Sequence, residues 1–390
     1  MNDVASSFVA LRYRNFRLLW LGQLVSMVGS MMQNVAILWH ISLLVPPAQK
    51  GLALGLVGLV RVVPIIILSL VSGVVADVLD RRKVMLLTQT GMALTAIVLA
   101  IVSFAGLHVA WPIYVLTALS AGIGTFDGPA RQALIPSLVP AEHFPNAISL
   151  NTVMFQFAAV LGPALGGLVL ATRGVSWVYA FNAISFVAVI VGLLLMRDLP
   201  VRARAAEQAQ PHISLGAAID GLRFVFGTPL IRSTMLLDFF ATFFSSATAL
   251  LPIFAQDILQ VGAQGYGLLF AAPAVGAFVA GLGMLRVANR IQRRGWVLLS
   301  AVLVYGLATV VFGVSHLFWL TFACLALTGA ADTVSMVLRN VVRQLATPDE
   351  LRGRMTSVNM IFFMGGPQLG ELEAGVVANA WGAPLSVISG

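Results

Sequence analysis

Residues 73–106 read GVVADVLDRRK and then VMLLTQTGMALTAIVLAIVSFAG. The first part is a short polar connection that ends in consecutive cations, whereas the second part, residues 84–106, carries no charge. An apolar run of about 20 residues is long enough to cross the hydrocarbon core of a bilayer. Backbone polar groups in lipid must be satisfied internally, so such a run forms a helix. This stretch therefore predicts membrane-spanning helices joined by basic connections.

The whole chain has the composition that this stretch suggests. Of its 390 residues, 59% are hydrophobic and 10% are charged, whereas soluble domains carry about 25% charged residues. The net charge of +8 resides in short connections rather than on one face, which excludes a nucleic-acid partner. Apolar runs recur up to the C-terminus, so the sequence predicts an all-α membrane protein with about eleven or twelve spans.

The residue types that hold cofactors and metals are scarce. Cys324 is the single cysteine and lies in an apolar run, which excludes an intrachain disulfide and a cysteine metal cluster. The histidines show no metal-ligand spacing, and the chain lacks the Gly-x-x-x-x-Gly-Lys-Ser/Thr phosphate loop. The sequence therefore predicts a protein that is not an enzyme, holds no cofactor or metal, and does not use ATP.

We expect two helical bundles. An N-terminal six-helix bundle covers residues 1–196, a cytoplasmic linker with a short surface helix over 214–226 covers 197–229, and a second bundle covers 230–390. Residues 386–388 begin a further apolar stretch, so we expect the sequence to stop within a twelfth helix. The complete spans are expected at 16–43, 52–76, 84–106, 111–135, 146–171, 174–196, 230–256, 265–286, 295–314, 317–342 and 356–381.

The distribution of lysine and arginine predicts the orientation. With a cytoplasmic N-terminus, nearly all cations between the spans face the cytoplasm, including Arg339 and Arg343 at the end of the tenth span. The opposite side then holds only Lys50 and Arg173. By the positive-inside rule, we expect a multi-pass protein of the bacterial inner membrane with its N-terminus in the cytoplasm.

The two halves of the chain resemble each other. A shift of 208 residues places Arg131 on Arg339, within a stretch that has further matches at polar, glycine and proline positions. A shift of 215 residues places Gln23 on Asp238. Two parallel repeats around a central pathway are an architecture of secondary transporters.

The connection between the second and third spans carries Gly73, Asp77, Asp80, Arg81 and Arg82. This pattern resembles the loop 2–3 motif of the major facilitator superfamily, with an aspartate in place of a usual glycine at position 80. The resemblance implies a gating contact, in which a carboxylate at a helix end meets cations or a helix N-terminus and separates when the halves rock. The alternative is a generic basic connection.

The segment at the end of the fourth span narrows the resemblance through Pro129, Arg131 and Pro136. It is similar to the exporter branch of this superfamily that contains the enterobactin exporter, macrolide efflux proteins and the lysophospholipid transporter. The resemblance extends over essentially the whole chain and specifies the branch better than the substrate.

The fifth span carries Gly162, Pro163, Gly166 and Gly167, which are similar to a motif associated with antiporters. Small residues also allow helices to approach closely, so helix packing is an equally good interpretation. Ala118 stands where the drug-antiporter branch often has an arginine, and the proton step ascribed to that arginine is therefore not carried over.

Charged side chains inside predicted spans are costly in lipid and indicate a cavity or pathway. Our hypothesis is that Asp238 and one of two glutamates exchange protons or meet a cationic substrate group, with Arg61 as partner or anion site. The alternative is a static ion pair that holds helices together. The charged candidates are Arg61, Asp238, Asp332, Glu371 and Glu373. The uncharged candidates are Gln23, Gln33, Asn34 and Gln156.

These features predict a monomeric secondary transporter that exports a small amphipathic molecule, such as a drug, macrolide or siderophore-like compound. Alternating access coupled to proton antiport is the expected mechanism, and the expected partners are the substrate, protons and the lipid bilayer. Two alternatives are a lysophospholipid facilitator and a membrane scaffold or sensor without transport activity.

Overall fold

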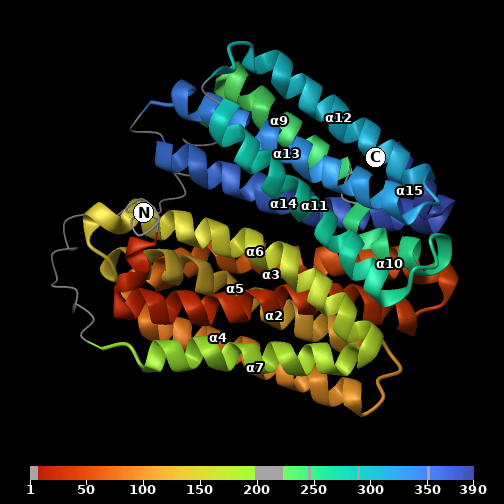
Figure 1. The fold of residues 1–390 in the computed structure, drawn as a ribbon, viewed down its shortest axis with the longest axis horizontal. Coiled ribbons are helices and arrows are strands. Elements are labelled where there is room, and N and C mark those ends of the chain that lie inside the picture. Colours follow the sequence, from red (N-terminus) through yellow and green to blue (C-terminus); the bar gives the residue numbers. More distant parts are fainter. Residues whose placement is uncertain (1–7, 198–222, 245–246, 288–289, 349–351) are drawn as a thin grey trace. The chain divides into compact units, whose positions relative to one another are not determined.

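The computed structural model describes residues 8–197, 223–244, 247–287, 290–348 and 352–390, and every regular element within these ranges is helical (Figure 1). The helices of the first repeat are α2 (Arg14–Leu44), α3 (Lys50–Val78), α4 (Arg81–Phe104), α5 (Trp111–Leu134), α6 (Phe144–Thr172) and α7 (Val175–Leu194). Those of the second repeat are α9 (Pro229–Phe244), α10 (Leu251–Ile253), α11 (Gly262–Val287), α12 (Arg294–Val314), α13 (Phe318–Ala346), α14 (Arg352–Trp381) and α15 (Ala383–Ser389). Shorter helical turns are η1 (Val9–Arg12), η2 (Pro47–Gln49), η3 (Ile135–Ser137), η4 (Ala141–His143), η6 (Ala247–Leu250) and the π-helix η7 (Phe254–Ile258).

The all-α prediction is confirmed. Within the described ranges, 9 helical segments are long and apolar enough to cross a membrane. Helices α5 and α14 have 24 and 30 residues, which is sufficient length, but they are not among these segments. The stretch expected to begin a twelfth helix forms α15.

The expected seventh span, 230–256, lies within Pro229–Ile258, one of the segments long and apolar enough to cross a membrane, and its second part consists of irregular turns. Helix α9 ends at Phe244, and η6, α10 and the π-helix η7 follow from Ala247 onward. Pro252 lies inside α10 and has no N–H to donate, which favours a break in regular α-helical bonding here. The expected surface helix over 214–226 lies mostly outside the described residues, of which 223–227 are helical.

The chain forms two compact units that depart from the predicted bundles in two segments. Unit 1 contains Met1–Ala53, Val60–Pro200 and Pro252–Ala271, and unit 2 contains the remainder, including Leu54–Leu59. The start of α3 is thus divided between the units, and the first part of α11 belongs to unit 1. Each unit therefore includes a short segment from the other sequence repeat.

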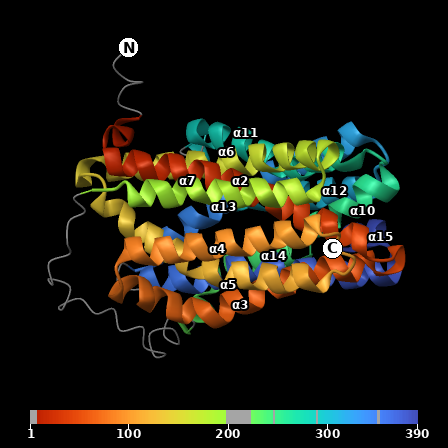
Figure 2. The same ribbon diagram turned by 90° about the horizontal axis from the view of Figure 1, so that it is seen from below.

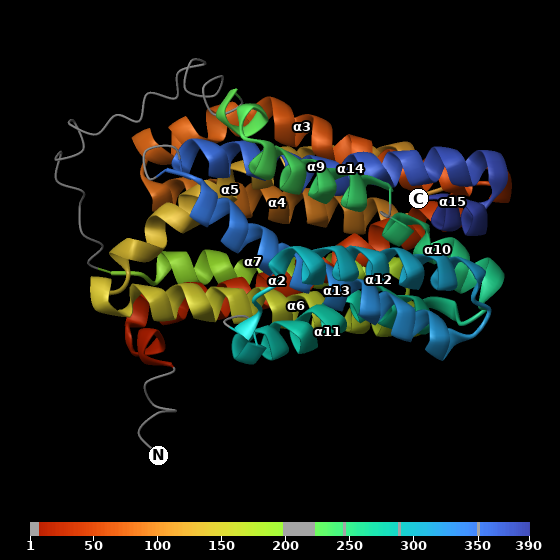
Figure 3. The same cartoon turned by 90° about the horizontal axis from the view of Figure 1, so that it is seen from above.

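Within unit 1, α2 packs along α7 and α6, and α4 packs against α7 and α5 (Figure 2). The α2–α7 contact is close because it is lined by small residues: a Cβ on Gly22 would lie 2.8 Å from the carbonyl oxygen of Ala188. Within unit 2, α12 packs against α13, and α14 packs against α9 and α15 (Figure 3). These helix pairs bring side chains from distant parts of each repeat together.

Candidate functional site

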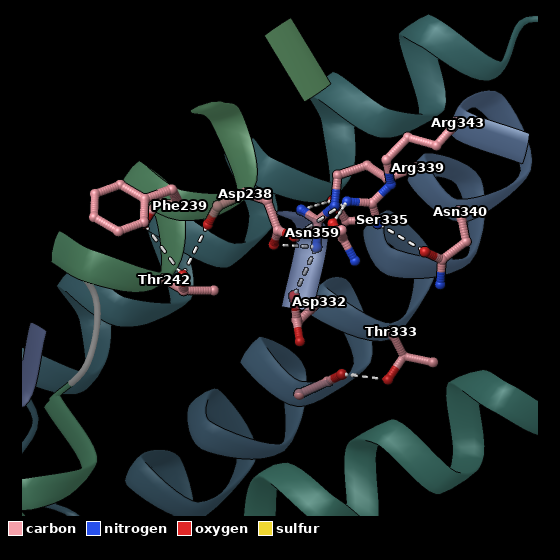
Figure 4. A network of polar contacts seen from close by, with 11 residues as sticks. Asp238, Phe239, Thr242, Asp332, Thr333, Ser335, Arg339, Asn340, Arg343 and Asn359 are labelled. Carbon is pink, nitrogen blue, oxygen red and sulfur yellow. Dashed lines mark hydrogen bonds and ion pairs between the residues drawn. The ribbon is translucent and has the colours of Figure 1, made fainter. Parts of the chain in front are cut away.

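A buried carboxylate lies at the centre of a charged network in unit 2 (Figure 4). Asp238 is on α9 and only 5% exposed. Its Oδ1 lies 2.6 Å from Nη2 of Arg339, and its Oδ2 lies 3.8 Å from Nη1 of Arg343. Positions four apart on a helix share one face, so α13 presents both guanidinium groups to the same carboxylate.

Further polar side chains complete the network on the α13 side. Arg339 donates to the Ser335 hydroxyl at 2.8 Å and lies 3.5 Å from Asp332, whose side chain is 41% exposed. Arg343 donates to Asn340 at 2.7 Å and also to Asn359 of α14. Three helices of unit 2 therefore contribute to the network.

The network has a clear electrostatic basis. A buried carboxylate without a partner would strongly destabilise the fold. The positive charges of two guanidinium groups compensate the negative charge of Asp238. Protonation of Asp238 would remove the negative charge that both arginines share. One carboxylate thus joins α9 to α13 through two charged contacts.

Unit 1 contains a related pair at the matching repeat positions, in which the arginine faces a neutral amide instead of a carboxylate. Nη1 of Arg131, on α5, donates to Oε1 of Gln23, on α2, at 2.9 Å. The repeat shifts that match Arg131 with Arg339 and Gln23 with Asp238 therefore correspond to a contact that is present in both units. This equivalence supports the internal repeat.

The remaining pathway candidates in unit 1 are placed apart from that pair. Arg61 on α3 donates to Asn34 on α2 at 3.2 Å. The Gln33 amide oxygen accepts from Asn182 on α7 at 2.7 Å, and both of these side chains are buried. Gln156 is partly buried on α6.

The two glutamates of the expected eleventh span lie on α14 in unit 2. The carboxylate of Glu371 faces Gly58, where an added Cβ would lie 3.0 Å from Oε2. Glu373 is partly buried. The described ion pairs of Asp238 are with the two arginines of α13, and neither glutamate takes part in them.

The basic connection before α4 has structural roles that the resemblance does not specify. Asp80 is the N-cap of α4 and accepts from the backbone N–H groups of Arg82 and Lys83. Arg81 donates to the Ala133 carbonyl at the end of α5, and Arg82 donates to a carbonyl at the end of α7. Guanidinium groups at helix C-termini satisfy free carbonyls and oppose the dipole. The backbone of Gly73 and Asp77 is helical, but the surroundings of these two residues are outside what the structure describes, so the gating role of this motif stays a prediction.

The glycines of the fifth span pack closely against other helices of unit 1. A Cβ on Gly162 would collide with Met31 of α2, and one on Gly166 would lie 3.2 Å from the Cα of Met32. Gly167 approaches Gly267 of α11, with 2.7 Å between an added Cβ and the Cα of Gly267. These close approaches require small residues at these positions, and the antiporter interpretation of the motif stays a prediction. Pro163 lies inside α6.

The branch motif surrounds the end of α5. Pro129 lies inside α5, and Pro136 lies in η3, directly after the helix. Between them, Arg131 is the member that makes a side-chain contact with another helix.

Several buried polar residues were missed by the sequence analysis. Asp127 on α5 accepts from Gln89 at 2.8 Å and from Thr88 at 3.1 Å, both on α4. Lys50 is buried and lies 3.0 Å from Asp257 of η7 within unit 1. Arg339 and Arg343 were interpreted as orientation signals only, although the 208-residue repeat shift already paired Arg339 with a motif residue.

Comparison with known proteins agrees with this fold. The family model described as "Transmembrane secretion effector" matches residues 5–390. The enterobactin exporter EntS of Salmonella choleraesuis (strain SC-B67) is 29% identical over 344 residues, which cover 88% of this chain and 80% of that protein. EntS of Shigella boydii serotype 18 is 30% identical with the same coverage.

Solved transporter structures share the fold at low sequence identity. A bacterial homologue of the human lysosomal transporter Spinster, inward-facing and unoccupied, has a TM-score of 0.74 at 16% identity, covering 95% of this chain and 83% of that one. A bacterial homologue of the iron transporter ferroportin has a TM-score of 0.68 at 17% identity, covering 96% of both chains. The chain therefore belongs to the transmembrane secretion effector family of major facilitator transporters.

Proposed function

We propose that this transporter exports a small amphipathic molecule by alternating access, coupled to proton entry. The export direction is supported by the family and by the printed name of the EntS relatives. The drug, macrolide and siderophore-like classes remain the proposed substrates. A facilitator of lysophospholipid movement would share the fold and differ in cargo.

The observation that carries the proposal is the contact of Asp238 with Arg339 at 2.6 Å between α9 and α13. A carboxylate in a membrane span can be neutral with a proton or anionic beside a guanidinium. When Asp238 takes up a proton, its attraction to Arg339 and Arg343 is lost, and the two helices are free to separate. When the proton leaves, the ion pairs form again. Alternation between these forms is a means to link proton transfer to helix movement.

The test uses the full chain in everted membrane vesicles, with a pH-gradient dye and a panel of amphipathic drugs, macrolides and a catechol compound. A transported compound should collapse part of the pH gradient in the wild type. Asp238→Asn should abolish this proton movement, because the amide cannot exchange a proton. Glu371→Gln and Glu373→Gln test whether a glutamate shares the role.

The matched control is Asp332→Asn, which makes the same chemical change on a half-exposed member of the network. It should leave proton movement within about twofold of the wild type, because Asp238 keeps its partners. Undiminished proton coupling in Asp238→Asn, Glu371→Gln and Glu373→Gln together would reject the proton pathway. A complete lack of transport for every compound, with correct folding, would favour the scaffold alternative.

A further inference from the structure

In the Arg131–Gln23 pair, the amide nitrogen of Gln23 is a buried donor that has no acceptor. Gln23 is 3% exposed, and its Nε2 is buried without a hydrogen-bond partner in the described part of the chain. Its Oε1 accepts from Nη1 of Arg131, and both amide atoms are bonded to the same carbon. The free amide donor therefore lies beside the guanidinium.

The positive charge of Arg131 has no acidic partner among the described residues of unit 1. No described carboxylate lies within 4.0 Å of its guanidinium. The described ion pairs of this unit are those of Lys50 with Asp257 and of His143 with Glu142. The described acidic side chains are engaged elsewhere. Asp80 caps α4, Asp127 accepts from Thr88 and Gln89, Glu142 lies beside His143, and Asp257 pairs with Lys50.

The second repeat has a carboxylate at the position that corresponds to Gln23. There Asp238 stands at the position of Gln23, and its carboxylate lies against Arg339, the counterpart of Arg131. The first repeat has the same arginine but an amide in place of the acid. A carboxylate is thus supplied by the chain in unit 2, whereas the described side chains of unit 1 place an amide there.

We propose that Arg131 and Gln23 form an anion-binding site that takes a carboxylate group. The carboxylate would accept from the Arg131 guanidinium and from Gln23 Nε2, which satisfies the buried amide and compensates the partly buried charge. The group belongs either to the transported molecule or to a free organic anion. The inference extends beyond the proposed function, since it concerns unit 1 and does not depend on proton coupling.

Benzoate is a suitable probe because it combines a carboxylate with an apolar ring. The purified full chain in detergent is heated while tryptophan fluorescence is followed, with benzoate, chloride or phosphate added at equal ionic strength. A ligand that binds only the folded state raises the melting temperature by mass action. At a benzoate concentration ten times its dissociation constant, the wild type should melt about 2 °C or more higher, and chloride and phosphate should have smaller effects.

Gln23→Glu is the decisive variant, since it replaces the free amide nitrogen with a carboxylate oxygen of nearly the same shape. It should fold with an unchanged or higher melting temperature, because the glutamate pairs with Arg131, and it should lose the benzoate response. Arg131→Gln should lose the response as well. The matched control is Gln132→Glu, which adds the same charge at the exposed neighbouring position and should keep the response.

Uptake of radiolabelled benzoate into proteoliposomes distinguishes the two sources of the carboxylate. Uptake that Gln23→Glu abolishes assigns the site to the cargo, whereas a thermal response without uptake assigns it to a free bound anion. Both results support the site. An equal benzoate response in the wild type and Gln23→Glu, or no response of the wild type to any of the three anions, would overturn it. Loss of proton coupling in Asp238→Asn bears on the proposed function alone.

Discussion

Arg339 Nη2 lies 2.6 Å from Asp238 Oδ1, and both side chains are buried within unit 2. The pair joins α9 to α13, which are distant in sequence and contact each other in the fold. Its counterpart in unit 1 is the hydrogen bond from the charged Arg131 to the neutral amide of Gln23. The two repeats thus keep the arginine and differ in the charge of its partner, and this difference underlies the two proposals made above, a titrating carboxylate in one repeat and an anion site in the other.

The ion pair should contribute strongly to the stability of unit 2. Asp238→Asn leaves two buried guanidinium groups without a full counter-charge, and loss of one partner of a buried pair costs about 3–5 kcal/mol. The free energy of unfolding should fall accordingly in an SDS titration in mixed micelles, followed by tryptophan fluorescence.

The double variant Asp238→Asn with Arg339→Gln measures the interaction energy between these two side chains. Because it also removes one of the orphaned charges, it should lose less stability than the sum of the two single variants, with a coupling of about 0.5–3 kcal/mol. Strictly additive losses would show that the two side chains do not stabilise each other.

The capping role of Asp80 predicts a modest and specific effect. Asp80→Ala removes the acceptor for two backbone N–H groups of α4 and should cost about 0.5–2 kcal/mol. Asp80→Ser keeps an oxygen at the cap and should retain most of the stability. The same SDS titration compares the two, and identical losses would indicate that Asp80 acts through its charge.

The close approach of α6 to α11 predicts opposite effects of alanine at two glycines. Gly167→Ala places a Cβ 2.7 Å from backbone atoms of α11, which must shift, so the variant should be destabilised by about 1–3 kcal/mol. Gly306→Ala is the control, since nothing beyond its own turn lies within 4 Å of the added methyl in α12. It should be neutral or stabilised by up to about 1 kcal/mol. Equal melting temperatures of the two variants would contradict the packing at Gly167.

The contact between Lys50 and Asp257 should depend on salt. Asp257→Asn removes the carboxylate partner of a buried lysine, although Lys50 still donates to Gln256 at 3.0 Å. The Asp257 side chain is half-exposed, so we expect a loss of about 1 kcal/mol at low ionic strength that shrinks in 1 M salt. A loss that is independent of salt would point to packing rather than to charge.

The positions of most spans could be predicted from the sequence because hydrophobic length is a local property. The expected span 84–106, for example, corresponds to α4, which runs from Arg81 to Phe104 after the Asp80 cap. The 3-10 and π turns from Ala247 onward were not predicted, since Pro252 is compatible with either a kinked helix or irregular turns. The repeat shift correctly related Gln23 to Asp238, but it did not indicate what either side chain touches.

The all-α membrane class, the approximate spans and the family resemblance follow from the sequence alone, because lipid demands long apolar helices and family motifs occupy short continuous stretches. Three contacts could be recognised only in the packed helices: Asp238 pairs with the arginines of α13, Asp80 caps α4, and Arg131 lies beside a buried amide. These contacts join helices that are far apart along the chain. Hydropathy identifies which segments cross the membrane, whereas the packing of the helices determines which side chains come into contact.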